Sequence, residues 1–325
     1  MLKLFFVSIS LITLLSQHNA YSASAEGFNS WKKSFTEEAV QKGIRRATVE
    51  NALRDVSYNP KIVQLDRSQP EFKINFQEYK RKVITEARIN KAKKLLKENY
   101  KLLDEVERFY GVPKRFIVAL WGVETSFGEV TGNFYIPAAL ATLAYDGRRQ
   151  EFFKAELLHS LKILDEGHIS KDKFKGSWAG AMGQCQFMPS SFFKFAQDYN
   201  QDGKKDIWAT RPDVFASIAN YLLSVGWNQK YNWGQRVILP VRFNKSLVND
   251  KINRPLQFFN KMGVRTLTGR FLPFENINAR IISPDDDAAR RGEYYIVYSN
   301  FDAIMHWNRS TYFATSVGLI ADSIE

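Results

Sequence analysis

Apolar residues recur at helical spacing along most of the chain. In a stretch dense in Lys, Glu, Ala and Leu they stand three or four positions apart, at Phe72, Phe76, Tyr79, Val83 and Ala87. Residues at that spacing share one face of a helix, so we expect helix across 71–108. Two shorter helices are expected over 28–58, joined near Gly43. A turn over 66–72 places Pro70 at the first position of the next helix.

Two segments depart from this amphipathic pattern. Residues 113–123 are apolar nearly all round, as in a helix that is buried on every side. Between 236 and 300, short β-branched and aromatic segments alternate with turn residues, which predicts strands. A last helix is expected over 312–324. The pattern as a whole predicts an α+β fold that is mainly α.

The first 25 residues are typical of a secretory signal peptide. Lys3 gives a positive start, residues 4–15 are almost entirely apolar, and Ala23-Ser24-Ala25 forms a small-x-small cleavage site. The apolar run is short for a membrane span, and no later stretch is apolar enough for a transmembrane anchor. No Cys near the cleavage site could carry a lipid anchor. We therefore expect a periplasmic protein, cleaved near Ala25.

Composition narrows the classes of partner. The 325 residues are 45% hydrophobic, enough for a sizeable core, and carry a net charge of +12. The basic residues form no recognisable nucleic-acid-binding motif, and export also argues against that role. An anionic wall polymer or membrane surface is the alternative partner. Cys185 is the only cysteine, so no intramolecular disulfide can form, and we expect it to be a buried residue rather than a nucleophile.

A carboxylate ends the apolar segment. Glu124 follows eight mostly apolar residues, near the expected C-terminal end of the helix. Burial raises the pKa of a carboxyl group, and the negative end of the helix dipole acts in the same direction. A Glu that stays protonated near neutral pH can protonate a glycosidic oxygen. Taken alone, a Glu near a helix end is more often a surface or paired charge, so both interpretations stay open.

Residues 176–191 form a second unusual segment. Its first eight positions hold three glycines and three Ala or Ser residues, which allows the backbone to approach a ligand closely. Ser177, Gln184 and Gln186 offer neutral hydrogen-bonding groups suited to hydroxyls and acetamides. Pro189-Ser190-Ser191 should start a helix with a Ser as N-cap. A tightly packed structural loop is an equal alternative.

Residues 198–209 have the ligand spacing of an EF-hand loop. Side-chain oxygens stand at loop positions 1, 3, 5 and 9, a backbone carbonyl at 7 and a glycine at 6: Asp198, Asn200, Asp202, Asp206, Lys204 and Gly203. Position 12 is Ala209 instead of the usual Glu, and Asp213 is the candidate for the missing carboxylate. We expect a structural Ca²⁺ remote from the chemistry and no organic cofactor. An Asx-rich turn without an ion is the alternative.

Together these segments resemble the B-type lytic murein transglycosylases, a family with a lysozyme-like catalytic core. The resemblance runs from about Phe28 to the C-terminus and rests on motifs in the same order: Asp66–Phe72, Tyr110–Pro113, Gly122–Thr125, Ala141–Leu143, Gly176–Ser191, Ala219–Tyr221 and Asn308–Tyr312. It implies an N-terminal helical region over 26–108 and a lysozyme-like core with the EF-hand-like loop over 109–234. It further implies a small β-containing region over 235–300. A C-terminal segment over 301–325 is expected to close the active site.

The resemblance also implies residue roles. Glu124 takes the place of the single catalytic acid/base, and Ser177 that of a serine supporting the glutamate and the sugar. Gln186 and Asn308 take the places of two further substrate-binding residues. Where relatives have Tyr before this Asn, the chain has Trp307, which keeps a ring but loses a hydroxyl and puts a hydrogen bond from this position in doubt.

The implied reaction cleaves the bond between MurNAc and GlcNAc in peptidoglycan glycan strands and leaves 1,6-anhydro-MurNAc ends. Glu124 protonates the linking oxygen, the muramic acetamide assists, and the ionised Glu124 then takes the proton of the C6 hydroxyl. A muramidase-type hydrolase is the first rival, for which Glu129 and Asp146 are the nearby second carboxylates. A non-catalytic wall-binding protein is the second rival. Other cell-wall enzymes are candidate partners.

Overall fold

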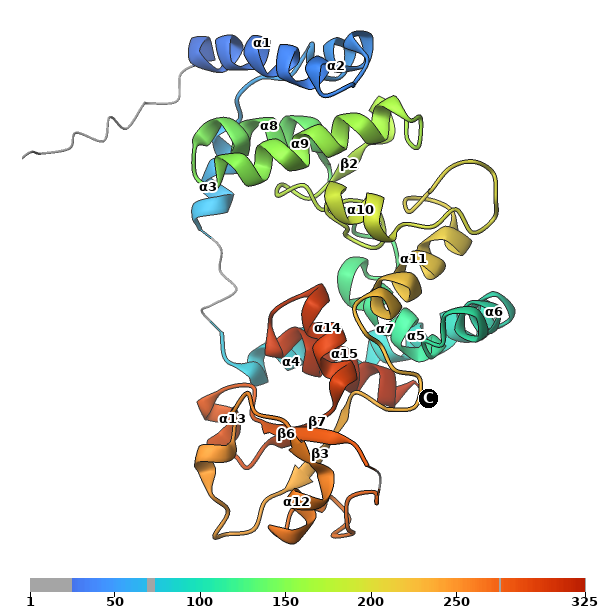
Figure 1. The fold of residues 1–325 in the computed structure, drawn as a ribbon, viewed down its shortest axis with the longest axis vertical. Coiled ribbons are helices and arrows are strands. Elements are labelled where there is room, and N and C mark those ends of the chain that lie inside the picture. The colour runs from blue at the N-terminus through green and yellow to red at the C-terminus, as the bar shows by residue number, and fades with distance from the viewer. Residues whose placement is uncertain (1–24, 69–73, 275, 325) are drawn as a thin grey trace, which may run out of the picture.

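The structure, a computed structural model, describes residues 25–68, 74–274 and 276–324. The molecule is elongated, with α1 (Ala25–Gln41) and α2 (Arg46–Leu53) at one end and a β-containing region at the other (Figure 1). No described helix has the length and apolar content to cross a bilayer. The expected signal peptide lies outside the described residues, apart from Ala25, at which α1 begins.

The described elements confirm the predicted mainly α fold class. The remaining helices are α3 (Pro60–Arg67), α4 (Phe76–Val83), α5 (Glu86–Glu98), α6 (Tyr100–Tyr110), α7 (Lys114–Thr125), α8 (Ile136–Asp146), α9 (Gln150–Asp165), α10 (Pro189–Phe195), α11 (Arg211–Ser224), α12 (Leu256–Lys261), α13 (Asp286–Arg290), α14 (Ser299–Trp307) and α15 (Thr311–Ser323). The strands are β1 (Phe134–Tyr135), β2 (Lys175–Gly176), β3 (Gly234–Ile238), β4 (Arg254–Pro255), β5 (Arg265–Thr266), β6 (Asn278–Ile282) and β7 (Tyr294–Val297).

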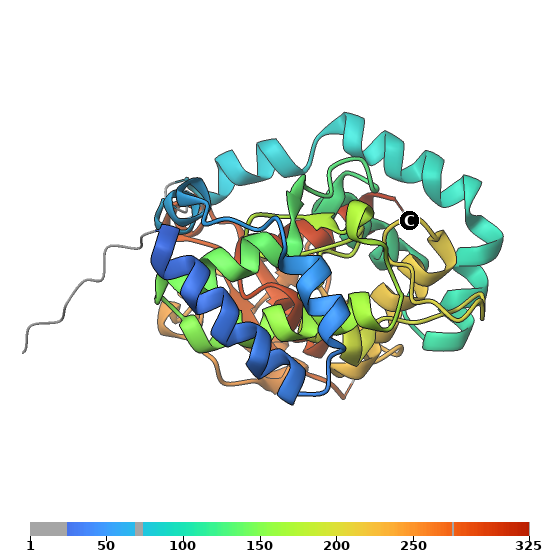
Figure 2. The ribbon, with the colours of Figure 1, turned by 90° about the horizontal axis from the view of Figure 1, so that it is seen from above.

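The helical stretch predicted across 71–108 is divided into α4, α5 and α6, which curve around one side of the molecule (Figure 2). Thr85 causes the first break, because its side chain accepts a hydrogen bond from the Arg88 N–H and caps α5. Asn99 causes the second, since its side-chain amide donates to the Leu95 carbonyl at the end of α5. The predicted turn over 66–72 is partly wrong because α3 continues to Arg67; Pro70 lies outside the described residues.

The apolar helix is confirmed as α7, whose residues from Phe116 to Gly122 are all buried. It packs against α5, α11 and α15, so elements distant in sequence surround it. Such surroundings explain why its sequence lacks a polar face. Residues before and after Gly111 belong to one hydrophobic core, and the domain boundary expected near 108 stays a prediction.

The β-containing region is an antiparallel sheet in the order β4-β6-β7-β3-β5. Alternate residues of β7 face different cores, as the period of two in a strand requires. Tyr295 and Val297 join the helical core, whereas Tyr294 and Ile296 join a second cluster between the sheet and α12. One sheet therefore closes a small core of its own and also supports the helices above it.

Candidate active site

Glu124 is the penultimate residue of α7, where the chain turns sharply away from the helix. Ser126 and Phe127 both have left-handed backbone angles, with φ of 51° and 65°. The Phe127 ring folds back over Gly122, where an added Cβ would come within 2.6 Å of it. The turn leaves Glu124 half-buried in the wall of a cavity of about 430 Å³.

The cavity combines an apolar floor with polar and cationic groups from distant segments. Its lining residues are Ile74, Tyr79, Lys82, Val83, Arg88, Val123, Glu124, Asn308, Ser310, Tyr312 and Phe313. Burial lowers the pKa of the Arg88 guanidinium, which donates to the Val83 carbonyl. Sequence reasoning found Glu124 and Asn308 but missed Tyr79, Lys82 and Arg88, because these lie on α4 and α5, where lysines and arginines are common on solvated faces.

Trp307 donates a hydrogen bond to Glu124. The distance from its indole Nε1 to the Glu124 Oε1 is 2.7 Å. The doubt about a hydrogen bond from this position was therefore wrong, because an indole carries an N–H donor in place of the missing phenol hydroxyl. This contact joins the ends of α7 and α14.

Aromatic rings hold the Trp307 indole in place. Its centroid lies 4.6 Å from that of Tyr221 and 5.3 Å from that of Phe187. The Tyr221 hydroxyl also donates to the His306 carbonyl, at 2.8 Å. Two of the motifs that carried the resemblance, one on α11 and one in the glycine-rich loop, thus meet at the residue that contacts Glu124.

In the glycine-rich loop over 176–191, some polar side chains form hydrogen bonds within the loop. The Ser177 Oγ accepts hydrogen bonds from the backbone N–H groups of Ala181 and Ala179, at 2.9 and 3.3 Å. The Gln186 amide nitrogen donates to the carbonyls of Thr131 and Gly183, and its φ of 50° is left-handed. Both side chains are held in fixed orientations and remain half-buried.

Two expectations for this loop were wrong. Gln184 does not offer its amide to a ligand, because Oε1 accepts from the Trp121 indole at 2.7 Å and Nε2 donates to the Trp208 carbonyl at 2.8 Å. No Ser caps α10, which begins after Met188. The buried carboxylate of Glu156 does so instead, accepting from both the N–H and the hydroxyl of Ser190. A charge from another helix thus satisfies the helix start, and local sequence cannot show that.

The EF-hand-like loop turns its acidic groups toward its own backbone. Asp198 accepts from the N–H groups of Asp202 and Gly203, and Asp206 from those of Trp208 and Ala209. The Asn200 amide donates to Asp202. Within the described ranges, no three His, Cys, Asp or Glu side chains form a group that could hold a metal ion. The donor types still fit Ca²⁺ in kind and spacing.

Asp213, the candidate twelfth-position carboxylate, lies buried beneath this loop. It accepts hydrogen bonds from the backbone N–H groups of Tyr199 and Asp206, at 2.9 and 2.8 Å. Burial raises the pKa of its carboxyl group, although these N–H groups oppose the shift. Its visible role is to anchor both ends of the loop to α11.

The other carboxylates considered as catalytic partners are engaged elsewhere. Glu129 is exposed and forms an ion pair with Lys91 at 2.5 Å, and Asp146 pairs with Arg67 at 3.1 Å. Cys185 is fully buried, and burial raises the pKa of its thiol well above the usual range. A protonated, enclosed thiol is a poor nucleophile.

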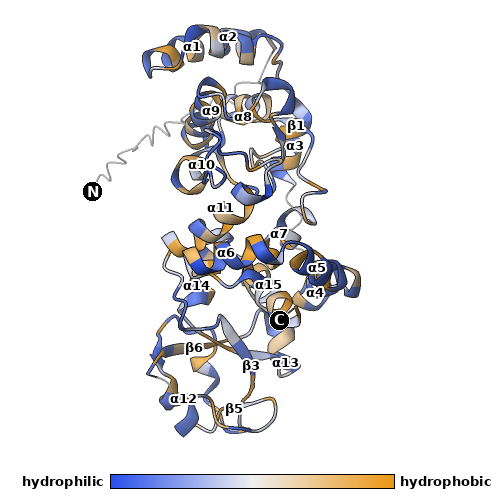
Figure 3. Cartoon of the chain, turned by 90° about the vertical axis from the view of Figure 1, so that its right-hand side faces the viewer, coloured by the Kyte–Doolittle hydropathy of each residue, from blue (hydrophilic) through white to orange (hydrophobic). Residues whose placement is uncertain are grey.

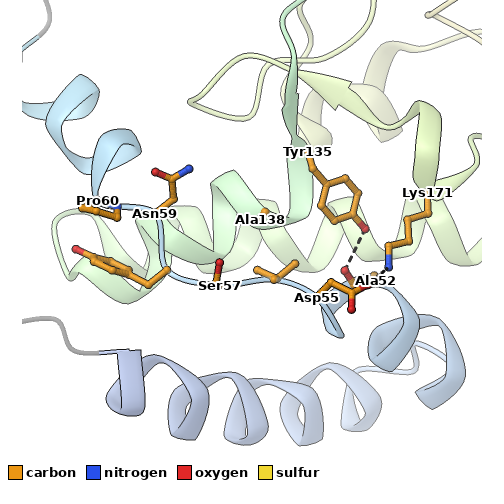
Figure 4. Close-up of a pocket in the computed structure, with 10 residues that line it drawn as sticks. Ala52, Asp55, Ser57, Asn59, Pro60, Tyr135, Ala138 and Lys171 are labelled. Atoms are coloured by element: carbon orange, nitrogen blue, oxygen red, sulfur yellow. Dashed lines mark hydrogen bonds and ion pairs between the residues drawn. The ribbon is translucent and has the colours of Figure 1, made fainter.

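A second cavity, of about 320 Å³, lies between the α2–α3 connection and β1 (Figure 4). Lys171 contacts Asp55 at 3.2 Å and donates to the Asn51 carbonyl, while the Tyr135 hydroxyl donates to the Ala52 carbonyl. These polar groups join the N-terminal helices to β1 and to the segment just before β2. The cavity is therefore best explained as a joint between elements.

Known proteins match this chain over most of its length. The model of the Transglycosylase SLT domain family matches residues 27–322. The chain belongs to this family. Among curated members, membrane-bound lytic murein transglycosylase B of Escherichia coli (strain K12) is 31% identical over 253 residues, which are 76% of this chain. They are 66% of that protein, so the chain spans just under two thirds of its length.

Solved structures confirm the predicted resemblance of this transglycosylase SLT protein. SltB3 from Pseudomonas aeruginosa, solved with NAG-NAM-pentapeptide, is 39% identical with a TM-score of 0.88, covering 91% of this chain and 79% of that one. SltB3 was also solved with NAG-anhNAM-pentapeptide. Slt35 from Escherichia coli, in complex with calcium, is 26% identical with a TM-score of 0.76, covering 90% and 92% of the two chains.

Proposed function

We propose that the protein is a lytic transglycosylase that cleaves the MurNAc–GlcNAc bond of peptidoglycan and leaves 1,6-anhydro-MurNAc ends. The observation that carries the proposal is the position of Glu124, half-buried at the end of α7 in a cavity and held by Trp307. The anhydro-sugar ligand of SltB3 supports the same reaction class.

In the first step, Glu124 protonates the oxygen between the two sugars. The Trp307 contact bears on which oxygen carries that proton. An indole N–H can only donate, and the carbonyl oxygen of a carboxylic acid is a better acceptor than its hydroxyl oxygen. Because Trp307 donates to Oε1, the acid proton is favoured on Oε2. Trp307 thus orients the acid without itself transferring a proton.

In the second step, the ionised Glu124 takes the proton of the muramic C6 hydroxyl, whose oxygen closes the anhydro ring. The acetamide of the same sugar assists departure of the leaving group. One protein carboxylate is then sufficient, whereas a two-carboxylate muramidase needs a second one at a set separation. The ion pairs of Glu129 with Lys91 and of Asp146 with Arg67 disfavour that rival.

Ser177, Gln186 and Asn308 are proposed to hold the amino sugar. The Ser177 Oγ accepts from its own loop, so its hydroxyl hydrogen can be donated to Glu124 or to substrate. Asn308 lines the Glu124 cavity, and the Ser310 backbone N–H donates to its side-chain oxygen, so that this bond does not use the amide N–H groups of Asn308. Trp307, next to Asn308 in the chain and packed on Phe187, supplies an aromatic face.

Product analysis tests the reaction class. The chain from residue 26 onward is incubated with purified sacculi, and the released muropeptides are identified by mass spectrometry. Anhydro ends are expected. Free reducing ends would instead establish a muramidase, and binding to sacculi without release would establish a non-catalytic wall-binding protein.

We also propose that the protein is exported to the periplasm after cleavage near Ala25. The charged, apolar and small-residue segments of its first 25 residues support this localisation. The loop over 198–209 is proposed to bind a structural Ca²⁺, for which the ligand spacing and the calcium complex of Slt35 are the support.

A further inference from the structure

The β-containing region exposes a group of apolar side chains, here called the apolar tip. It consists of Ile238, Val241, Leu267, Phe271 and Phe274, which are between 48% and 101% exposed. These side chains come from the end of β3, the loop that follows it, and the loop after β5. Monomeric proteins seldom leave such side chains together in water without a function for them.

Strand pairing brings the end of β3 next to the segment that leads into the loop after β5. Ile238 pairs with Arg265 across β3 and β5, two residues before Leu267. The ring centroids of Phe271 and Phe274 lie 6.2 Å apart. β5 is an outer strand of the sheet, and Figure 3 shows β5 and α12 together at the end of the molecule opposite α1 and α2.

Positive charge surrounds the apolar tip. Residues 236–275 contain eight Lys and Arg against one Asp and one Glu, a net charge of +6 in a chain whose total is +12. Arg242, Lys261 and Arg270 are exposed. The Arg265 guanidinium carbon lies 4.0 Å from the centroid of the Phe271 ring, so a cation is directly against an exposed aromatic side chain.

We propose that the apolar tip docks on an anionic lipid bilayer. Phenylalanine and aliphatic side chains bury favourably at the boundary between head groups and acyl chains, and arginine and lysine bind anionic head groups. A soluble polyanion would match the charge alone and leave the apolar side chains in water. The bilayer matches both features, and its site shares no residue with the Glu124 cavity.

Vesicle co-sedimentation tests the docking with the full chain from residue 26. Vesicles containing phosphatidylglycerol should retain the protein, and pure phosphatidylcholine vesicles should not. Raising the ionic strength from about 0.1 M to about 1 M shortens the screening length and should weaken the binding. No binding to the anionic vesicles, or equal binding to both compositions, overturns the proposal.

Two variants separate the apolar and charged contributions. The double substitution Phe271→Ser and Phe274→Ser should weaken binding at least ~10-fold by removing the inserted rings. Arg242→Glu with Arg270→Glu leaves the rings in place and should weaken it at least as much, since each basic residue contributes about fivefold. Phe109→Ser, at another exposed phenylalanine, is the matched control and should bind as the wild type does.

Wild-type binding by either double variant contradicts the proposal. Size-exclusion chromatography tests the alternative that the apolar tip binds a second copy of the chain. A dimer that depends on Phe271 and Phe274, without vesicle binding, also overturns it.

Discussion

The helical body, made of the helices outside residues 235–300, and the β-containing region place their apolar residues differently. In the helical body, α7 is enclosed by other helices, and its polar end residue Glu124 faces a cavity. In the β-containing region, one face of the sheet supports the helices, while the far end exposes large apolar side chains. The described residues of the motifs that carried the family resemblance lie outside the five-stranded sheet, in helices, loops and, for Gly176, the short strand β2. The proposed chemistry therefore belongs to the helical body, and the β-containing region provides a supporting surface.

The two regions are nevertheless joined at the walls of the Glu124 cavity. Asp285, at the start of α13, accepts hydrogen bonds from the Phe76 N–H at the start of α4, at 2.6 Å, and from the Tyr312 hydroxyl, at 2.7 Å. Glu293 pairs with Lys80 of α4 at 2.7 Å. Residues that flank α13 in the β-containing region thus hold α4 and α15, from which Tyr79 and Tyr312 enter the Glu124 cavity.

The largest expected effect is that of Glu124→Gln. Gln keeps the size of the side chain and an oxygen that can accept from Trp307, but it cannot transfer a proton. Glycan cleavage should fall by roughly 10³-fold, within the range that general acid–base catalysis contributes. Muropeptide release measures it, and an unchanged melting temperature shows that the fold is intact. If the variant still cleaved glycan strands, Glu124 would not be the catalytic acid/base, and the assignment of the active site to the helical body would be wrong.

Trp307→Phe should have the next largest effect. It keeps an aromatic ring against Tyr221 and removes the donor to Glu124, so activity should fall roughly 10- to 100-fold, as expected for a hydrogen bond to a charged group. Loss of the donor disfavours the carboxylate, and the alkaline limb of the pH–activity profile should move to higher pH.

Trp307→Tyr is the matched control, because it returns a donor-bearing ring and should recover most of the activity. Equal loss in the Phe and Tyr variants, with no shift of the pH profile, would show that Trp307 acts by packing alone.

Asp285→Ala tests the joint between the two regions. It should lower the free energy of unfolding by about 2 kcal/mol, the cost of removing a charged acceptor shared by several donors. Burial works to raise the pKa of Asp285, but the N–H groups of Ala288 and Phe76 and the Tyr312 hydroxyl hold it below its usual value of 3.8. Its contribution is therefore complete above that value and is lost as the pH falls below it.

Thermal unfolding across acidic pH measures this effect. The difference between wild type and Asp285→Ala should shrink at the lowest pH values. The exposed neighbour Asp286 supplies the control, since Asp286→Ala should change the free energy of unfolding by less than about 0.5 kcal/mol.

Calcium should have the smallest effect. If the loop over 198–209 binds Ca²⁺, saturating ion should stabilise the protein by about 2.7 kcal/mol at a hundredfold excess over Kd, and by less at lower excess. Because position 12 is Ala209, we expect weak binding, and free Ca²⁺ at about four times Kd stabilises by only about 1 kcal/mol. Calorimetric titration and melting with and without chelator measure it. Asp202→Ala should abolish the shift, and an unchanged melting temperature in wild type would leave the loop as an Asx-rich turn.

The sequence predicted helices and strands well where the hydrophobic pattern alone determines the local structure. The all-round apolar pattern identified α7, and alternating β-branched segments identified β3, β6 and β7. It failed where a partner from elsewhere decides the outcome. Glu156 from α9 caps α10, and Trp121 and Trp208 occupy the amide of Gln184. No local pattern near Ser190 or Gln184 encodes those partners.

By itself, the sequence determined the helical class, the buried segment with its terminal carboxylate, and the family, because period and motif order are properties of the chain alone. Only the tertiary structure decided that an indole meets Glu124 and that α4 forms part of the cavity wall. It also brought the basic and apolar residues of the sheet region together at one end. The reason is that contacts among residues far apart in sequence depend on how whole elements pack, and packing minimises exposed apolar area over the entire molecule.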